Sequence, residues 1–330
     1  KNNEVQKILN SKSSILDNKT IQSLLKEELL LLVLKKTLIV DSSLEKILTK
    51  LREKILFLLN DSNKDILNNY FDFITALSEQ SLLNEYIHFQ SKGEIENINK
   101  LKNKIENSEE INEIEIALLG CYIPLKTSKI ILNKLFKYKS KNILFNNLIT
   151  THIKEPLKEA ELRSSIKSLG NISDTVSIKV KNQYEENPYP RWKYTNKSFH
   201  LNFLTWLNVE IKPNKVSENY KFDKPDVLIA GCGTGRHTIA SERYLNSNIL
   251  GIDLSLTSLV YAKRKILELG FKNIEFLHAD ILQLKELNKK FDVIESVGTL
   301  HHMRDPLEGL KVLTDILKPG GFLKLGLYSE

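Results

Sequence analysis

The spacing of apolar residues over the first half of the chain predicts helices. Between Ile21 and Leu59, apolar residues recur every three or four positions, which is the period of one helix face. The polar run 41–43 interrupts this pattern, so two antiparallel helices joined by a short turn are expected. Further helical patterns continue to Ser168 with few glycines or prolines. Residues 1–180 are therefore expected to form an irregular all-helical domain, because they lack a convincing repeat of about 34 residues that would mark tetratricopeptide repeats.

A change of composition at residues 184–192 marks a boundary. Two prolines separated by one residue exclude a regular helix there and favour extended backbone at Asn187 and Tyr189. We therefore expect residues 181–221 to form a linker or a lid. Its side chains allow two interpretations, a lid that covers a ligand or a rigid connection whose aromatic rings are buried between domains. The candidate lid residues are Tyr184, Tyr189, Arg191 and Trp192.

Short apolar runs alternate with helical patterns from residue 222 to 330. Strands are predicted at 227–230, 249–253, 274–277, 291–296 and 322–328, with helices near 236–244, 256–269 and 307–317. Strict alternation of strand and helix predicts a parallel, doubly wound sheet of the Rossmann-like α/β class. The expected fold is thus an α/β core preceded by an all-α N-terminal domain.

A glycine-rich turn follows the first predicted strand. Gly231, Gly233 and Gly235 are separated by single residues. Glycines permit a tight turn and let a ligand approach the backbone at the carboxyl edge of such a sheet. The third glycine of the usual nicotinamide spacing is missing, and so is the Gly-Lys-Ser/Thr of a phosphate-binding loop. A phosphate site is therefore not the first expectation.

Carboxylates follow the next two predicted strands at positions suited to a nucleoside. Asp253 ends the second strand, where it can accept hydrogen bonds from both hydroxyls of a ribose. Asp280 follows the third strand, where it can accept a hydrogen bond from an exocyclic amino group. The fourth strand ends at Glu295, Ser296 and Val297 and leads into Gly-Thr-Leu-His-His.

These motifs, in this order, resemble the class I S-adenosylmethionine-dependent methyltransferases. The resemblance implies that the glycine loop lies beneath the methionine part of the cofactor, that the second-strand acid holds the ribose, and that the third-strand acid reads the adenine. S-adenosylhomocysteine would be the product. One position departs from the family pattern, because the acid common two residues before the first glycine is here Ile229, and backbone groups or Glu295 are candidates to replace it. The cofactor-binding residues that the resemblance implies are Gly231, Cys232, Gly233, Gly235, Asp253, Leu254, Ala279, Asp280, Glu295, Ser296 and Val297.

A closer resemblance starts from Asn-Pro-Tyr-Pro-Arg-Trp at 187–192 ahead of the glycine loop. This combination is similar to bacterial methyltransferases with helical or tetratricopeptide N-terminal regions, among them the rickettsial protein lysine methyltransferases. The resemblance implies a lysine-containing outer-membrane or surface protein as the methyl acceptor. A small-molecule acceptor such as a quinone precursor stays open, because residues 299–303 also look like the loop of quinone-pathway methyltransferases. A further alternative, suggested by Ile229, is an interaction protein whose cofactor fold has lost activity.

His301 and His302 are the candidate catalytic residues, since they follow the strand that the resemblance places at the methyl group. Methyl transfer depends mainly on positioning, but a lysine amine must lose a proton before it attacks. The two histidines would shape the site or relay that proton; the alternative is that they cap the helix that begins near Asp305. Cys232 is either a reactive thiol or a small residue packed against the sheet, and packing is favoured because no base or second cysteine accompanies it.

Composition limits the partners and the compartment. The net charge is +7, and 33 basic and 27 acidic residues precede position 221, so most of the excess lies in the N-terminal part. Because an Arg-rich patch is missing, nucleic acid is not an expected partner. Two distant cysteines offer neither a disulfide framework nor a metal site and fit a reducing cytoplasm. The longest apolar run, 29–40, falls short of the about 20 residues that cross a bilayer.

Two further expectations concern assembly and extent. A homodimer is expected because helical domains of this type often associate, although no heptad seam compels it. The single methionine is Met303, and residue 330 lies where the predicted fifth strand ends. We therefore expect the protein to extend beyond both ends, with part of the substrate site beyond residue 330.

Overall fold

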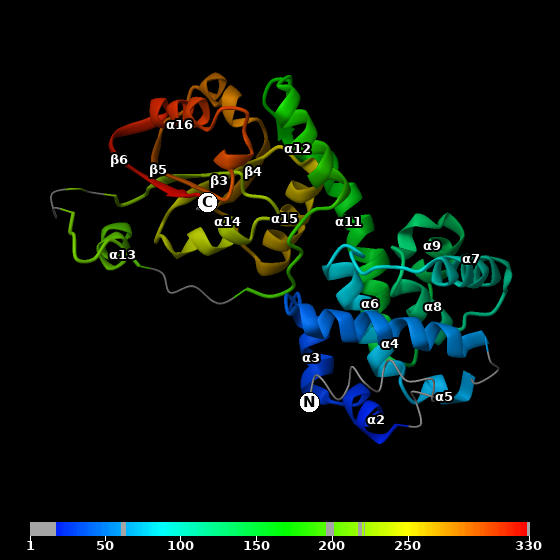
Figure 1. Ribbon diagram of the computed structural model, residues 1–330. Helices are drawn as coiled ribbons and strands as arrows, with labels where there is room; N and C mark the ends of the chain where they lie inside the picture. Colours follow the sequence, from blue (N-terminus) through cyan, green and yellow to red (C-terminus); the bar gives the residue numbers. More distant parts are fainter. Residues whose placement is uncertain (1–17, 61–63, 196–200, 217–219, 221, 329–330) are drawn as a thin grey trace. The chain divides into compact units, whose positions relative to one another are not determined.

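The computed structural model describes residues 18–60, 64–195, 201–216, 220 and 222–328, which form two compact units (Figure 1). Within the described residues, the helical unit contains 18–157 and 190–194, and the sheet unit contains 158–189 and 195–328. Segment 190–194, which lies inside the predicted linker, therefore belongs to the helical unit.

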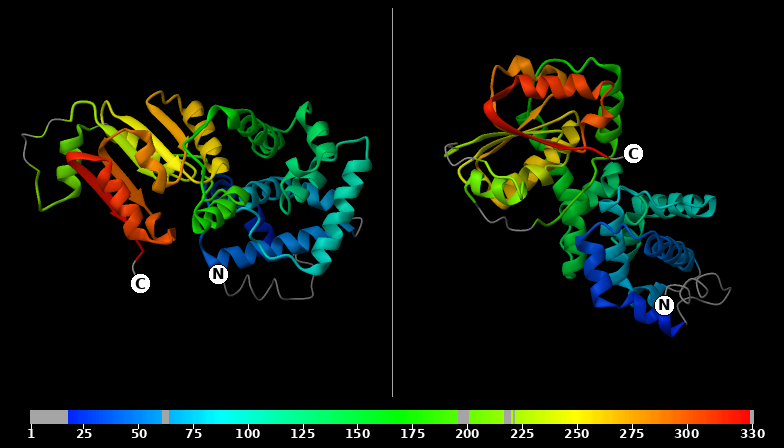
Figure 2. Two further views of the ribbon diagram at one scale, coloured as in Figure 1. Left: turned by 90° about the horizontal axis from the view of Figure 1, so that it is seen from above. Right: turned by 60° about the vertical axis from the view of Figure 1, so that its left-hand side comes forward.

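Short α-helices build the helical unit, drawn from blue to green in Figures 1 and 2. In chain order they are α2 (Lys19–Leu25), α3 (Glu28–Lys36), α4 (Ser42–Asn60), α5 (Lys64–Asn68), α6 (Phe71–Leu83), α7 (Lys92–Asn107), α8 (Glu113–Gly120), α9 (Lys129–Phe136) and α10 (Ile143–Ile149). The 3₁₀ turn η2 (Leu125–Thr127) precedes α9, and the π-helical turn η3 (Thr150–Lys154) follows α10. The next helix, α11 (Glu155–Leu162), crosses the division between the units.

Polar side chains start these helices at the positions where the apolar pattern is interrupted. Oδ1 of Asp41 accepts a hydrogen bond from the backbone N–H of Leu44 at 2.7 Å, which fixes the predicted turn before α4. Ser91 and Glu94 form a reciprocal capping box at the start of α7. The expected two-helix hairpin is wrong in one respect. The first of the two predicted helices is divided into α2 and α3, which lie on either side of Lys26.

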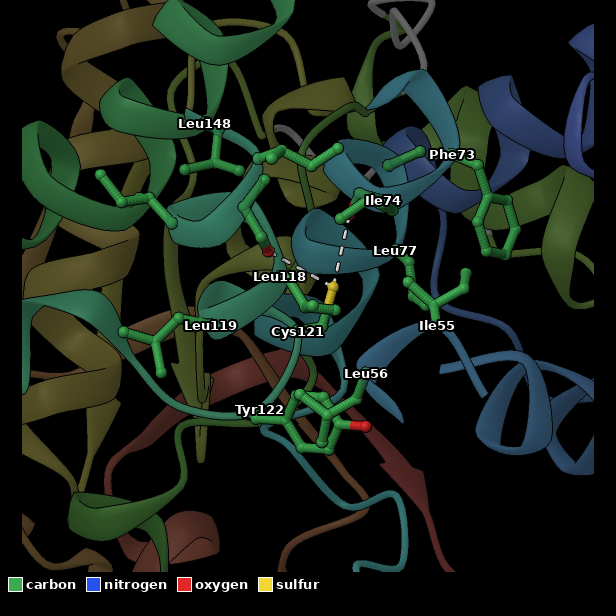
Figure 3. Packing of buried hydrophobic residues seen from close by; sticks show 14 of the residues in the cluster. Ile55, Leu56, Phe73, Ile74, Leu77, Leu118, Leu119, Cys121, Tyr122 and Leu148 are labelled. Carbon is green, nitrogen blue, oxygen red and sulfur yellow. Dashed lines mark hydrogen bonds between the residues drawn. The ribbon is translucent and has the colours of Figure 1, made fainter. Parts of the chain in front are cut away.

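The core of the helical unit is built around α6 and α8. Nearly all of the α6 side chains are buried, so this helix lies inside the unit rather than on its surface. Figure 3 shows the apolar side chains around Cys121, whose Sγ lies 3.4 Å from the carbonyl oxygens of Ile74 and Ala117. A Cβ atom added at Gly120 would lie 2.3 Å from Oγ of Ser78, so only glycine lets α8 approach α6 this closely.

We expect Leu118→Ala to lower the free energy of unfolding by about 2–5 kcal/mol, because the side chain is 1% exposed and its removal leaves a cavity. Leu29→Ala is the matched control, since that leucine is 66% exposed, and its effect should stay within about 0.5 kcal/mol. Urea unfolding followed by circular dichroism measures both values. Equal effects of the two substitutions would contradict the core described above.

The sheet unit contains a parallel sheet of six strands in the order β1-β4-β3-β2-β5-β6. The strands are β1 (Lys167–Ser168), β2 (Asp226–Ala230), β3 (Asn248–Asp253), β4 (Ile274–His278), β5 (Phe291–Val297) and β6 (Leu317–Gly326). The helices are α12 (Thr175–Glu186), α13 (Phe203–Glu210), α14 (Arg236–Ala240), α15 (Leu256–Leu269) and α16 (Pro306–Asp315). The 3₁₀ turns are η4 (Arg163–Ser165), η5 (Ser241–Arg243), η6 (Ile281–Leu287) and η7 (Leu300–His302).

This topology confirms the predicted doubly wound α/β core, with helices covering both faces of the sheet (Figure 2). One face packs Leu228, Ala230 and Ile294 against residues of η6 and α16. Two departures concern chain segments that we expected to be helix or linker. Residues 167–168 form the edge strand β1, and residues 181–221 contain the end of α12 and all of α13. Among the described residues, no helix combines the length and apolar content that crossing a membrane requires.

Candidate functional site

The glycine loop lies at the carboxyl end of β2 and is held by the end of β3. The backbone N–H groups of Gly231 and Cys232 both donate to the carbonyl oxygen of Ile252, at 3.0 and 2.8 Å. Gly233 has φ +51°, and a Cβ atom added there would meet nothing within 4 Å, so its backbone faces open space. Gly231 is required for a different reason, because a Cβ there would lie 2.1 Å from Oγ1 of Thr299.

Asp253 closes the glycine loop from strand β3. Its Oδ2 accepts a hydrogen bond from Gly233 N–H at 2.7 Å, and its Oδ1 accepts one from Ser255 N–H at 2.9 Å. Burial raises the pKa of the carboxyl, the two backbone N–H groups oppose this rise, and the charge of Glu185 adds to it. Each oxygen has a second acceptor position, so the carboxylate can still accept hydrogen bonds from a ligand.

The residues predicted beside the adenine lie next to Asp253. The N–H of Ala279 donates to the carbonyl oxygen of Asp253 at 3.1 Å, and Nε2 of His278 lies 2.9 Å from the carbonyl oxygen of Leu254. Asp280 is 4% exposed, and its Oδ1 caps η6 by accepting from Leu282 N–H at 3.0 Å. The structure therefore brings Asp253, Leu254, Ala279 and Asp280 together at adjacent strand ends.

The three residues that end β5 lie in different environments. Val297 is 43% exposed, whereas Glu295 and Ser296 are fully buried. Oγ of Ser296 donates to the carbonyl oxygen of Ala230 at 3.3 Å, which links the end of β5 to the end of β2. Only Val297 of the three presents its side chain to the surface beside the glycine loop.

Glu295 accepts hydrogen bonds from side chains in the segment that follows the glycine loop. Nε2 of His237 lies 2.5 Å from Oε2, Nη2 of Arg243 lies 3.2 Å from Oε1, and the hydroxyl of Tyr244 donates to Oε1. Burial acts to raise the pKa of Glu295, but these partners outweigh it and lower the pKa to about 2. Lys324, its neighbour in register on β6, pairs instead with Glu210. Sequence reasoning identified Glu295 but missed the roles of Arg243 and Tyr244.

Four rings lie beyond the carboxyl ends of the strands, and we call Tyr184, His301, His302 and Tyr328 the ring group. The His301 ring centroid lies 4.2 Å from that of His302 and 4.5 Å from that of Tyr328. Tyr184 contacts His302 edge-on at 6.4 Å. Burial and, to a smaller extent, the proximity of His301 lower the pKa of His302, so the His302 ring is neutral at neutral pH. Tyr328 was not predicted from the sequence.

The alternative capping role of the two histidines finds no support here, because Asp305 caps α16 itself through Leu307 N–H at 2.9 Å. Among the described residues, both ring nitrogens of His301 are buried without a hydrogen-bond partner. Buried polar atoms without a hydrogen-bond partner are uncommon in proteins.

The end of α12 is fixed to the start of α15 by residues that sequence reasoning missed. Oε1 of Glu185 accepts from Leu256 N–H at 2.6 Å, and Oε2 accepts from Oγ1 of Thr257 at 2.5 Å. Oγ of Ser255 donates to the carbonyl oxygen of Tyr184 at 2.9 Å. These contacts hold Tyr184 beside the strand end that carries Asp253.

The four predicted lid residues belong to different units. Tyr184 and Tyr189 lie in the sheet unit, whereas Arg191 and Trp192 lie in the helical unit, where Arg191 pairs with Glu85. Lys193 likewise pairs with Glu79 of the helical unit. Of the four, only Tyr184 belongs to the ring group.

Cys232 lies inside the glycine loop but is 5% exposed. Burial raises its pKa well above the usual value, and the charge of Asp253 adds to the rise. The thiol is therefore protonated at neutral pH, which supports the packing interpretation over a reactive one.

Comparison with known proteins gives the class of this site. Residues 227–321 match the family described as Methyltransferase domain. This part of the sheet unit is thus similar to methyltransferase domains, in agreement with the class that the sequence motifs predicted.

This chain matches only part of the length of its relatives. An uncharacterized protein of Synechococcus, syc1184_c, is 36% identical over 113 residues, which are 32% of this chain and 26% of that protein. Demethylmenaquinone methyltransferase of Bacillus cytotoxicus is 32% identical over 92 residues, 27% of this chain and 39% of that protein. The solved structure of PKMT2 from Rickettsia typhi matches with 33% identity and a TM-score of 0.28, covering 31% of this chain and 21% of that one. The chain thus spans well under half the length of these relatives.

The residues at the strand ends fit S-adenosylmethionine. Gly233 leaves open space against the loop backbone, Asp253 retains acceptor positions for a ribose, and buried Asp280 lies next to it along the same edge. S-adenosylmethionine supplies an electrophilic methyl group and the sulfur that leaves with the bonding electrons. Asp253 and the glycine loop would hold it.

We expect Asp253→Asn to weaken S-adenosylmethionine binding at least tenfold. The substitution keeps the shape of the side chain but replaces a charged acceptor, whose hydrogen bonds contribute about 1.5–3 kcal/mol each. Isothermal titration calorimetry measures the affinity, and Glu308→Gln, an exposed carboxylate on α16, is the control. A variant that binds as tightly as the parent would overturn the ribose assignment.

Glu295 gives a pH dependence whose sign follows from its lowered pKa. Its charged form stabilises the fold by about 3 kcal/mol above the ordinary carboxyl pKa, and this contribution disappears as the pH falls from about 4.5 towards 2. The difference in unfolding free energy between the parent and Glu295→Gln should therefore be constant from pH 5 to 8, within about 1 kcal/mol, and shrink below pH 4.5. Urea titrations at each pH test this, and a difference that grows with acidity is the contrary result.

Proposed function

We propose that this protein is an S-adenosylmethionine-dependent methyltransferase that methylates the side-chain amine of lysine in a protein acceptor. The activity is supported by the match of residues 227–321 to a methyltransferase domain and by the fit of the strand ends to the cofactor. The acceptor class is supported by the resemblance of residues 187–192 and the glycine loop to the bacterial protein lysine methyltransferases. The corresponding substrate is a lysine-containing outer-membrane or surface protein.

The methyl acceptor that we propose is supported by His301 of the ring group. Among the described residues, neither ring nitrogen of His301 has a hydrogen-bond partner. A neutral amine donates an N–H to an imidazole nitrogen while its lone pair stays directed at the methyl carbon. The rings of Tyr184, His302 and Tyr328 lie around that position and can contact the aliphatic part of the lysine side chain. His302, which is neutral at neutral pH, offers a second acceptor for the proton that must leave.

The transfer step balances as an in-line displacement. The nitrogen lone pair forms the new bond to the methyl carbon, and the carbon–sulfur bond breaks with its electrons remaining on sulfur. The proton lost by the amine passes to solvent or through His302. This chain's contribution is to orient the amine and accept that proton.

A small-molecule acceptor is the second candidate. It is favoured by the similarity to demethylmenaquinone methyltransferase, which is 32% identical over 92 residues, or 27% of this chain. A phenolic or enolic acceptor would use the same orphaned imidazole, because its hydroxyl also donates a hydrogen bond. The two candidates therefore differ in the acceptor and share the ring group.

We expect methyl label from S-adenosylmethionine to enter lysine of an outer-membrane protein fragment and to be recovered as methyl-lysine after acid hydrolysis. His301→Phe should lower this rate at least tenfold while cofactor affinity, measured by calorimetry, changes less than twofold, because phenylalanine keeps the ring and removes both nitrogens. Leu307→Ala, an exposed position on α16, is the control.

The other outcomes divide the alternatives. Label in demethylmenaquinone and none in polypeptide would establish the small-molecule acceptor. Cofactor binding without transfer to either acceptor would favour an inactive interaction protein. A normal transfer rate in His301→Phe would remove His301 from the acceptor site.

A further inference from the structure

Glu295 occupies a place in the sheet where an ionised side chain is costly. It is paired in register with Ile229 on β2 and with Lys324 on β6, near the carboxyl ends of these strands. It is fully buried. An unpaired carboxylate in such a place would cost several kcal/mol, so its environment must supply compensating partners.

The compensating partners all come from one short segment that follows the glycine loop. His237 lies two residues after Gly235, in the first turn of α14, and Arg243 and Tyr244 lie at the other end of the segment. One carboxylate therefore holds both ends of residues 236–244, through His237 on Oε2 and through Arg243 and Tyr244 on Oε1. His237 retains 26% exposure of its side chain, so it connects the buried carboxylate to the surface beside the loop.

Aromatic side chains exclude water from this arrangement. The guanidinium of Arg243 stacks over Trp206 of α13 at 4.2 Å, and Trp206 contacts Tyr244 edge-on at 5.0 Å. Nη1 of Arg243 donates to the carbonyl oxygen of Ala240 at 2.9 Å, which fixes the guanidinium within the same segment. Low local dielectric strengthens each charge-assisted hydrogen bond to Glu295.

We propose that Glu295 is a positioning residue for S-adenosylmethionine binding, which fixes His237 and the segment 236–244 in the arrangement that the glycine loop requires. Its carboxylate does not contact the cofactor; it acts through His237. This inference rests on the proposed function, since it assigns a role within the same cofactor site.

The test is a double-mutant cycle on cofactor affinity. Glu295→Gln and His237→Gln should each weaken S-adenosylmethionine binding at least tenfold by calorimetry, and the double variant should bind no more than twofold more weakly than either single variant. Glu275→Gln, an exposed carboxylate on β4, is the control and should bind like the parent. Losses that multiply in the double variant, or a Glu295→Gln affinity within twofold of the parent, would overturn the proposal.

A second measurement separates this proposal from the proposed function and from simple loss of folding. In ¹⁵N-histidine-labelled parent protein without cofactor, the Nε2 proton of His237 should give a downfield, slowly exchanging signal that Glu295→Gln removes while the remaining histidine signals persist. Parent protein that shows this signal but does not bind S-adenosylmethionine would refute the proposed function and with it the cofactor role of Glu295. Parent protein that binds the cofactor but lacks the signal would overturn the positioning role alone.

Discussion

The site depends on hydrogen bonds between the glycine loop and the end of the neighbouring strand β3. Two loop N–H groups share the carbonyl oxygen of Ile252, and a third donates to Asp253. A loop of this kind has little preference for one conformation by itself, because glycine loses more conformational freedom on folding than any other residue. The pairing of β2 with β3 supplies the fixed acceptors that select one conformation. The cofactor site is therefore a property of the assembled sheet rather than of the glycine sequence alone.

The same edge of the sheet gathers the other elements of the site because parallel strands end together there. Thr299 donates towards the carbonyl oxygen of Ala230, which ties the loop after β5 to the end of β2. Glu185 caps α15, so the segment that carries Tyr184 is attached to the end of β3. These contacts thus hold the loop after β5 and the end of α12 near the carboxyl ends of β2 and β3.

The sequence predicted the sheet well because its signals are local. Alternating apolar runs gave five of the strands, and the spacing of Gly231, Gly233 and Gly235 located the loop. Strand β1 was missed because two residues carry no periodicity and their pairing with β4 joins positions 110 residues apart. The partners of Glu295 were missed for a similar reason, since they lie 51 to 58 positions away in sequence. The grouping of residues 190–194 with the helical unit depends on ion pairs to Glu79 and Glu85 that are more distant still.

The two carboxylates of the site differ in their hydrogen-bond partners, and this difference suggests different roles for them. Asp253 is held by neutral backbone N–H groups, and burial raises its pKa. Glu295 is held by His237, Arg243 and Tyr244, which together outweigh burial and lower its pKa to about 2. A carboxylate with strong side-chain partners on both oxygens has few acceptor positions left for a ligand. A carboxylate that accepts only two backbone N–H groups can also accept hydrogen bonds from ribose hydroxyls, which stabilise its charge. The electrostatics therefore support our proposal that Asp253 binds the cofactor and that Glu295 acts by positioning His237, although both residues are carboxylates near the carboxyl ends of strands in one sheet.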